Sequence, residues 1–340
     1  MIDLVEEHFR KEPKTWLLTG VSGFIGTNIL KRLLTLGQKV VGLDNFSTGV
    51  KENLQQVQKL VGEEAWSLFT MIEGDIRDFS TCKRAMEGVD IVLHQAALGS
   101  VPRSFANPGL TNEVNVGGTV NIFQAAKEMG IKKVVYASSS SVYGDSQELP
   151  KVEENLGNAL SPYAVSKLTD ELYASVFSNS TDMDLIGLRY FNVFGPYQSP
   201  EGPYAAVLPL WVKGMIKNQP ITIFGDGETS RDFTFVENVV DINLLAAHAE
   251  KGKAKLRAYN CACSAAYTLN ELHDTMQEKL AEDYPHVTKL EKKYGDFREG
   301  DVRHSHADIS NASEDLGYKP RYVLAEGIDM ALEWYKNNLL

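Results

Sequence analysis

The chain has 340 residues, of which 43% are hydrophobic and 23% are charged, and its 34 basic and 45 acidic side chains give a formal net charge of −11. This composition predicts a globular protein of one large or two modest domains and argues against a disordered or low-complexity chain. An acidic balance without a basic run argues against nucleic acid or an anionic membrane as the main partner.

The cysteine content and the N-terminal segment favour a cytoplasmic location. Three cysteines, Cys82, Cys261 and Cys263, are too few for a disulfide framework. We interpret the Cys261–Cys263 pair as strand packing and expect no metal, since no His or Cys lies nearby at ligand spacing. Residues 1–14 lack the apolar segment of a secretory signal, and no apolar run is long enough to span a membrane.

The first half of the chain alternates short apolar runs with amphipathic segments. The near-continuous apolar runs are typical of strands covered on both faces, so we predict a Rossmann-like α/β fold with a doubly wound parallel sheet. We expect residues 1–14 to form an extra helix outside this sheet. The predicted strands are 16–19, 39–43, 70–73, 90–94, 133–137 and 185–188, and the predicted helices are 24–36, 80–86, 112–129, 162–179, 236–249, 269–280 and 326–337.

Turn signals become frequent after residue 190, as in Gly195-Pro196, Gly202-Pro203 and Gly225-Asp226-Gly227. We therefore divide the chain into two interleaved parts. Residues 1–189 with about 232–262 form the predicted dinucleotide-binding domain. Residues of about 190–231 with 263–340 form a smaller substrate-binding domain.

Glycines at positions 20, 23 and 26 lie between the first predicted strand and the first predicted helix of the sheet. Glycines there allow a tight turn and a close approach of the backbone to a pyrophosphate at the helix N-terminus. A plain structural turn is the alternative. Asp44 ends the second strand, where a carboxylate accepts from the ribose hydroxyls of NAD and repels the 2′-phosphate of NADP. No Arg follows between residues 45 and 50, which favours NAD.

Three further segments follow strands on the same side of the predicted sheet. Asp75 and Ile76 follow the third strand and are candidates for the adenine edge, although Asp75 could instead cap the next helix. Gln95-Ala96-Ala97 follow the fourth strand and are small enough for the backbone to pass close to the cofactor. Asn115 lies in the next helix, where a buried, purely hydrogen-bonding role is the alternative.

The segment around Tyr163 carries the chemistry. Ser161 is a candidate N-cap and Pro162 a candidate first helical residue, which places Tyr163 in the first turn of a helix. Lys167 follows at i+4 on the same face. A nearby ammonium and the helix dipole both favour the phenolate, so the pair can serve as a general base and acid. A surface pair is the alternative.

The strand at 133–137 runs into Ser138-Ser139-Ser140-Ser141-Val142-Tyr143-Gly144. A hydroxyl at the carboxyl end of such a strand can hydrogen-bond a reacting oxygen, because ligands of open α/β sheets bind there. A turn or a helix cap is the alternative.

These motifs, together with 189–196, resemble the extended short-chain dehydrogenase/reductase family. Within that family the chain is similar to the nucleotide-sugar 4-epimerases, most of all the UDP-N-acetylglucosamine 4-epimerases of surface-polysaccharide synthesis. The resemblance runs from about residue 14 to the C-terminus. It implies an NAD-dependent isomerase that oxidises C4 of a UDP-sugar to a transient 4-keto sugar and reduces it again on the opposite face.

The resemblance also implies residue roles. Tyr163 acts as base and acid on the 4-hydroxyl, Lys167 lowers its pKa and binds the nicotinamide ribose, and Ser139 hydrogen-bonds the 4-oxygen. The remaining substrate-binding residues are Ser140, Asn192, Ala206 and Val207, with Arg231 and Arg298 on the phosphates and Asp301 on the uridine ribose. The remaining cofactor-binding residues are Phe24, Ile25, Asn45, Ser138, Tyr190 and Val193.

Two positions bear on the reaction and the sugar. Dehydratases and decarboxylases of the family carry an acidic side chain where Ser141 stands, so we expect simple epimerisation. Members restricted to unacetylated sugars carry a bulky aromatic where Ser305 stands, so we expect an N-acetylated UDP-hexose. Gly99 and Ser100 are similarly small and are predicted to flank the sugar.

Several alternatives stay open. UDP-N-acetylglucosaminuronate or UDP-glucose could be the substrate, with Arg103 and Arg303 as candidate partners of a uronate carboxylate. A one-way dehydrogenase and a non-catalytic NAD-binding regulator are the other functions considered. The resemblance implies a homodimer formed through a four-helix bundle, with residues 112–129 and 162–179 as candidate helices.

Overall fold

A seven-stranded parallel sheet forms the centre of the computed structural model, which describes residues 1–199, 206–297 and 302–338. The strand order is β11-β6-β5-β4-β1-β2-β3, and every pair is parallel. The prediction of a Rossmann-like doubly wound sheet is therefore confirmed. The strands are β1 (Thr15–Thr19), β2 (Lys39–Asp44), β3 (Phe69–Glu73), β4 (Ile91–His94), β5 (Lys133–Ser139), β6 (Asp184–Tyr190) and β11 (Ala258–Cys261).

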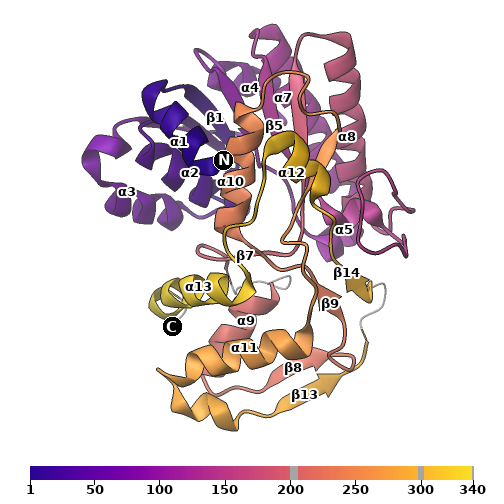
Figure 1. The fold of residues 1–340 in the computed structure, drawn as a ribbon. Coiled ribbons are helices and arrows are strands. Elements are labelled where there is room, and N and C mark those ends of the chain that lie inside the picture. The colour runs from indigo at the N-terminus through magenta and orange to yellow at the C-terminus, as the bar shows by residue number, and fades with distance from the viewer. Residues whose placement is uncertain (200–205, 298–301, 339–340) are drawn as a thin grey trace.

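Helices cover both faces of the sheet (Figure 1). One face packs against α2 (Phe24–Thr35), α3 (Lys51–Trp66) and α10 (Val236–His248), and the other against α4 (Phe79–Ala85), α7 (Gly118–Glu128) and α8 (Pro162–Ser180). The strand order reverses between β1 and β4, where the connections leave in opposite directions. The crevice at the carboxyl ends of these two strands is the place where open α/β sheets bind ligands.

The predicted N-terminal helix is present as α1 (Ile2–Lys11), outside the sheet. Val5 and Phe9 face inward, and the Phe9 ring meets Trp16 edge-on with the ring centroids 5.0 Å apart. Glu6 forms an ion pair with Arg32 of α2. The helix therefore belongs to the same apolar core as α2 and α10.

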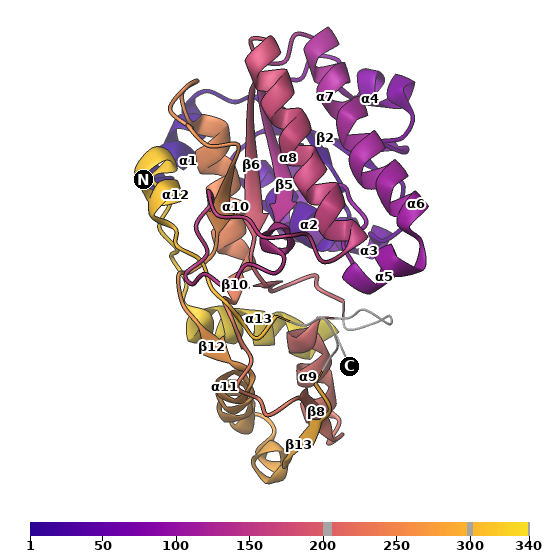
Figure 2. The same cartoon turned by 90° about the vertical axis from the view of Figure 1, so that its right-hand side faces the viewer.

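A second group of elements packs around its own apolar cluster beyond the sheet (Figure 2). Its core includes Trp211, Met276 and Ile328, each at most 4% exposed. The elements are α9 (Val207–Ile216), β8 (Ile221–Phe224), α11 (Leu269–Ala281), η3 (Pro285–Lys289), β13 (Lys292–Gly295) and α13 (Leu324–Asn338). Between the two groups the chain returns to the sheet through α10 and β11. The exact domain boundaries stay a prediction.

The connecting elements are short. They are α5 (Val101–Ala106), α6 (Pro108–Asn112), η1 (Glu113–Gly117), η2 (Ser140–Tyr143), β7 (Val193–Phe194), β9 (Ser230–Arg231), β10 (Thr234–Phe235), β12 (Tyr267–Thr268), β14 (His304–Ser305) and α12 (Ser310–Leu316). Within the described residues, no helix is both long and apolar enough to cross a membrane.

The prediction missed several elements, among them α3, α5, α9 and α12, and it merged two helices into one. Helix α3 was not expected, because its sequence is largely polar and only Asn53, Leu54 and Val57 are buried. The single helix expected at 112–129 is instead α6 and α7 joined by the π-helical turn η1. That turn directs the Asn115 side chain inward, where its Oδ1 accepts from the Leu98 amide at 2.8 Å.

Candidate active site

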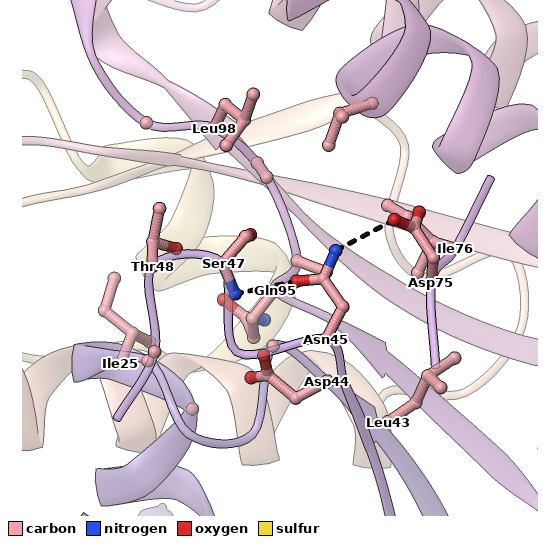
Figure 3. A pocket seen from close by; sticks show the side chains of 18 of the residues that line it. Ile25, Leu43, Asp44, Asn45, Ser47, Thr48, Asp75, Ile76, Gln95 and Leu98 are labelled. Carbon is pink, nitrogen blue, oxygen red and sulfur yellow. Dashed lines mark hydrogen bonds between the residues drawn. The ribbon is translucent and has the colours of Figure 1, made fainter. Parts of the chain in front are cut away.

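A cavity of about 300 Å³ lies at the carboxyl ends of β1, β2, β3 and β4 (Figure 3). The structure brings twelve of the predicted cofactor-binding residues together in its wall. They are Gly20, Gly23, Phe24, Ile25, Gly26, Asp44, Asn45, Asp75, Ile76, Gln95, Ala96 and Ala97. Sequence reasoning missed Leu43, Ser47, Thr48, Gly49, Gly74, Leu98 and Val114, and assigned Gly99 to the sugar.

The glycine loop has the geometry that a pyrophosphate requires. Gly20 has a φ of +68°, and a Cβ there would lie 2.8 Å from the Ala96 nitrogen. Gly23 is the N-cap of α2 and provides no side-chain cap, so the backbone N–H groups of the first turn point to the cavity without a side-chain acceptor. Such a helix N-terminus attracts anions through its N–H groups and its dipole.

Asp44 is oriented by two backbone amides. Its Oδ2 accepts from the Ser22 nitrogen at 2.9 Å, and its Oδ1 accepts from the Phe46 nitrogen at 2.8 Å. Each carboxylate oxygen has a second acceptor position, so Asp44 can still accept from ribose hydroxyls. Together the glycine loop and this carboxylate fit a dinucleotide with an unphosphorylated 2′-hydroxyl.

Asp75 belongs to the wall and does not cap the next helix. Its Oδ2 accepts from Asn45 Nδ2 at 2.9 Å, as Figure 3 shows. Hydrogen bonds from the Arg77 guanidinium hold the pKa of Asp75 down at about 2. The cap of α4 is Asp78, which accepts from the Ser80 amide. The cap interpretation of Asp75 is therefore wrong.

Four residues expected at the cofactor lie behind or beside this cavity. Asn115 is buried and donates to Ser166 Oγ at 3.0 Å, so the structure shows the hydrogen-bonding alternative for it. Ser138 donates to Glu171 at 2.6 Å. The Tyr190 hydroxyl donates to Gln95 at 2.9 Å and so supports the cavity wall. Val193 lines a different cavity, described below.

A second cavity, of about 710 Å³, collects two of the three predicted catalytic side chains, Ser139 and Tyr163, with several of the predicted substrate-binding residues. The predicted residues in its wall are Ser139, Ser140, Tyr163, Asn192, Arg231 and Ser305. Apolar side chains that the sequence analysis did not identify complete it, among them Val101, Pro102, Phe105, Leu160 and Val302. Ser100 is absent from this wall, because it is the N-cap of α5 and accepts from the Arg103 amide at 3.2 Å.

Helix α8 presents Tyr163 to this cavity. Ser161 caps the helix by accepting from the Ala164 amide at 3.1 Å, and Pro162 is its first residue, as predicted from the sequence. Tyr163 is half-buried in the first turn. Lys167, one turn further, is buried, and its ammonium donates to the carbonyl of Ala137 in β5 at 2.9 Å.

Ser139 is a helix cap and also lies at the end of a strand in the cavity wall. It ends β5 in the cavity wall, and its hydroxyl caps the 3-10 turn η2 by accepting from the Ser141 amide at 3.2 Å. Since the hydroxyl accepts from that amide, its proton remains available to donate toward an oxygen in the cavity.

A third cavity, of about 310 Å³, adjoins the second and shares Asn192 and Arg231 with it. Ala206, Val207 and Val193 line it, and so do the aromatic residues Trp211, Phe224 and Phe233, which the sequence analysis did not identify. Arg231 donates to the Ser230 carbonyl at 2.8 Å. The predicted Arg298 and Asp301 lie outside the described residues.

The chain was compared with known proteins. A model of the NAD dependent epimerase/dehydratase family matches residues 16–262. The UDP-glucose 4-epimerase of Mycolicibacterium smegmatis is 35% identical over 324 residues, which cover 94% of this chain and 98% of that protein.

Two solved structures are also similar. One is the UDP-N-acetylglucosamine 4-epimerase of Methanobrevibacter ruminantium in complex with UDP-N-acetylmuramic acid, with a TM-score of 0.87, 35% identity, and coverage of 96% of this chain and 99% of that chain. The other is the Thermus thermophilus UDP-glucose 4-epimerase in complex with NAD, with a TM-score of 0.80, 30% identity, and coverage of 95% and 99%. The cofactor of the family is NAD.

The glycine loop provides a test of the cofactor site. A Cβ at Gly26 would lie 2.1 Å from the Gly20 carbonyl oxygen, so Gly26→Ala must displace the loop that contacts the pyrophosphate. We expect NAD affinity to fall about tenfold or more, since overpacking at a tight site costs on the order of 1–3 kcal/mol. Calorimetric titration with NAD measures it. Gly117→Ala is the control, because its Cβ meets nothing closer than 4.0 Å. Equal affinities in the two variants would contradict the assignment.

Proposed function

The chain belongs to the NAD dependent epimerase/dehydratase family, and we propose that it interconverts UDP-N-acetylglucosamine and UDP-N-acetylgalactosamine by epimerisation at C4. One observation carries this proposal: Tyr163, Ser139 and Ser305 line a single cavity at the carboxyl end of β5. Tyr163 and Ser139 provide acid–base chemistry at a sugar hydroxyl. Ser305 is small and leaves space beside the sugar.

The reaction needs a proton to leave and return at the 4-hydroxyl. In the proposed mechanism Tyr163 takes this proton, with the Lys167 ammonium and the α8 dipole favouring the phenolate. Ser139 donates a hydrogen bond to the 4-oxygen and holds it during the 4-keto stage. When bound, NAD supplies hydride acceptance and return at C4. The chain's own residues position the sugar and move the proton.

The proposed UDP site is the third cavity with its neighbours. Asn192 and Arg231 stand between the sugar cavity and the smaller cavity, where a diphosphate linking sugar and uridine has to pass. A guanidinium offers forked donors that suit phosphate oxygens. Ala206 and Val207 begin α9 and provide backbone groups to the uridine.

The sugar assignment rests on the size and polarity of the second cavity. Its volume of about 710 Å³ and the small Ser305 side chain provide room for a 2-N-acetyl group. The Methanobrevibacter neighbour, which binds an N-acetylated UDP-sugar, supports this choice. Arg103 and Arg303, considered for a uronate, do not line this cavity, and Arg303 pairs with Asp226 at 2.6 Å. Ser141 stands in its wall, and none of the described residues that line this cavity is acidic, which favours epimerisation over dehydration.

Incubating the purified protein with UDP-N-acetylglucosamine, UDP-N-acetylgalactosamine, UDP-glucose and UDP-galactose tests the activity. We expect both acetylated sugars to reach the same product ratio, without net change in NADH absorbance, and Tyr163→Phe to lower the rate by about 100-fold or more. Stoichiometric NADH release would indicate a dehydrogenase instead. NAD binding without turnover of any of the four sugars would favour a regulator.

Replacing the side chain beside the sugar tests the substrate. We expect Ser305→Tyr to abolish turnover of UDP-N-acetylglucosamine, because the ring would fill the space of the acetyl group, and to spare UDP-glucose. Steady-state rates on both sugars measure the effect. Ser310→Tyr, on the exposed start of α12, is the matched control. An equal loss on both sugars would show that Ser305 does not select the sugar.

We further propose that the protein is a homodimer formed mainly through α8. Val165, Leu172 and Val176 are 52%, 49% and 61% exposed and recur along one side of this helix. Of the other candidate helix, at 112–129, Met129 alone appears among the exposed large apolar side chains of the described residues. We expect Val176→Lys to yield monomers in analytical ultracentrifugation. Leu60→Lys, at an exposed site on α3, should leave the wild-type mass unchanged. A monomeric wild type would refute the dimer.

A further inference from the structure

Tyr163, Lys167 and Asp170 lie on one face of α8, because side chains three and four residues apart share a helix face. Asp170 is only 1% exposed, and its Oδ2 lies 3.3 Å from the Lys167 ammonium nitrogen. With the Ala137 carbonyl at 2.9 Å, that ammonium has two acceptors among the described residues. An ammonium has three N–H donors, so one is left for a group in the active site.

A buried series of hydrogen bonds also runs from the cofactor cavity to Thr119, which lies near Asp170. The Ala96 amide, in the cavity wall, donates to Thr19 Oγ1 at 3.2 Å. Thr19 Oγ1 lies 2.7 Å from His94 Nδ1, and His94 Nε2 lies 3.0 Å from Thr119 Oγ1. The Thr119 hydroxyl in turn lies near enough to Asp170 to lower the pKa of its carboxyl.

The His94 ring in this series is neutral. Burial, with the Lys167 charge, lowers the pKa of His94 to about 3, so the ring carries a single proton, on Nδ1 or on Nε2. This series therefore brings no positive charge to the Asp170 carboxylate.

Burial disfavours the ionised form of Asp170. Burial raises the pKa of Asp170 to about 6, against the opposing effects of Lys167 and Thr119, so the group is ionised at neutral pH. Its Oδ1 has no hydrogen-bond partner within the described parts of the chain. Glu171 of the same helix is tied to Arg189, and the other titratable neighbours, His94 of β4 and Tyr136 of β5, are neutral. Lys167 is therefore its one ionic partner there.

A buried carboxylate with an unsatisfied oxygen lowers the stability of the fold. An asparagine amide would fit the same volume without that charge. The geometry points to a purpose for the charge, since it pairs with the lysine one helical turn beyond Tyr163.

We propose that Asp170 is a positioning residue for the epimerisation, whose carboxylate holds the Lys167 ammonium against β5 and keeps it charged beside Tyr163. This inference rests on the proposed function of Tyr163 and Lys167. Asp170 itself does not touch substrate or cofactor. It acts through Lys167.

The effect of the Asp170 charge has the same electrostatic sign for Lys167 and for Tyr163. A negative charge stabilises the protonated form of an ammonium and of a phenol, so removing it lowers the pKa of Lys167 and of Tyr163 together. The acid limb of the kcat/KM profile depends on Tyr163 losing its proton, and the alkaline limb on Lys167 keeping its own. Both limbs should therefore move to lower pH when the charge is removed.

Asp170→Asn, which keeps size and hydrogen bonding, is the test variant. In the holoenzyme we expect the alkaline limb of kcat/KM to move down by about one pH unit or more and the acid limb by less. A second readout is independent of turnover: the ultraviolet absorbance of tyrosinate, taken as the difference from the same protein carrying Tyr163→Phe, gives the Tyr163 midpoint. That midpoint should also fall.

Asp241→Asn is the matched control, because Asp241 is equally buried, lies on α10 and pairs with Arg321 at 2.6 Å. It should lower the melting temperature and leave both limbs and the Tyr163 midpoint in place. Asp170→Asn behaving in the same way would overturn the proposal and leave Asp170 a purely structural residue. A wild type that epimerises no UDP-sugar would refute the proposed function, while a shifted Tyr163 midpoint would still support the role of Asp170.

Discussion

The buried ion pair between Glu171 and Arg189 is the interaction on which the catalytic half of the structure depends. Glu171 accepts from Arg189 Nε at 2.9 Å and Nη2 at 2.8 Å, and also from Ser138. Arg189 Nη1 donates further to the Tyr143 hydroxyl at 3.0 Å and to the Glu153 carbonyl at 2.9 Å. Burying two charges is tolerated when the pair is bidentate and its remaining groups are satisfied, as they are here.

This pair joins α8 to β5, β6 and the turn η2 at one point. Helix α8 consequently has a fixed height and rotation relative to the sheet, and Tyr163, two turns before Glu171, reaches the end of β5 where Ser139 lies. The cofactor cavity depends on another close approach, between Gly20 after β1 and Ala96 after β4. Both sites thus follow from contacts at the carboxyl ends of the strands. The net charge of −11 has little influence there, because local donors dominate at short range.

Much of the fold was predictable, because buried parallel strands are read directly as apolar runs. The six strands predicted from the sequence are present within a few residues, as are the helices at 24–36, 80–86 and 162–179. Helix α3 was not predicted, since its few buried side chains give a weak periodic signal. The π-helical turn escaped because it follows from where the Asn115 side chain bonds after folding, and no local pattern encodes that.

The site was predictable where a motif fixes backbone geometry, as with Gly20, Asp44 and Ser161. It was less so where a side chain's direction depends on tertiary packing. Ser138 and Ser139 are neighbours on β5, yet one bonds Glu171 behind the sheet edge and the other faces the cavity. Asp170 and Glu171 could have been identified, because both fall on the helix face that Tyr163 and Lys167 define. A charged pair on a predicted buried face is a signal for a tertiary partner.

The π-helical turn η1 has a consequence for the register of the helices that flank it. One residue more than an α-helical turn is accommodated between Glu113 and Gly117. Removing one residue there would restore a regular helix with its flanking segments in place, whereas winding the same residues as a regular α-helix would rotate everything beyond the turn by about 100°. Thr119 would then leave His94, and the apolar side of α7 would turn from the sheet toward water. The irregular turn therefore sets the rotation of α7 relative to α6. As a result, one continuous helix presents Asn115 to Leu98 and Thr119 to His94.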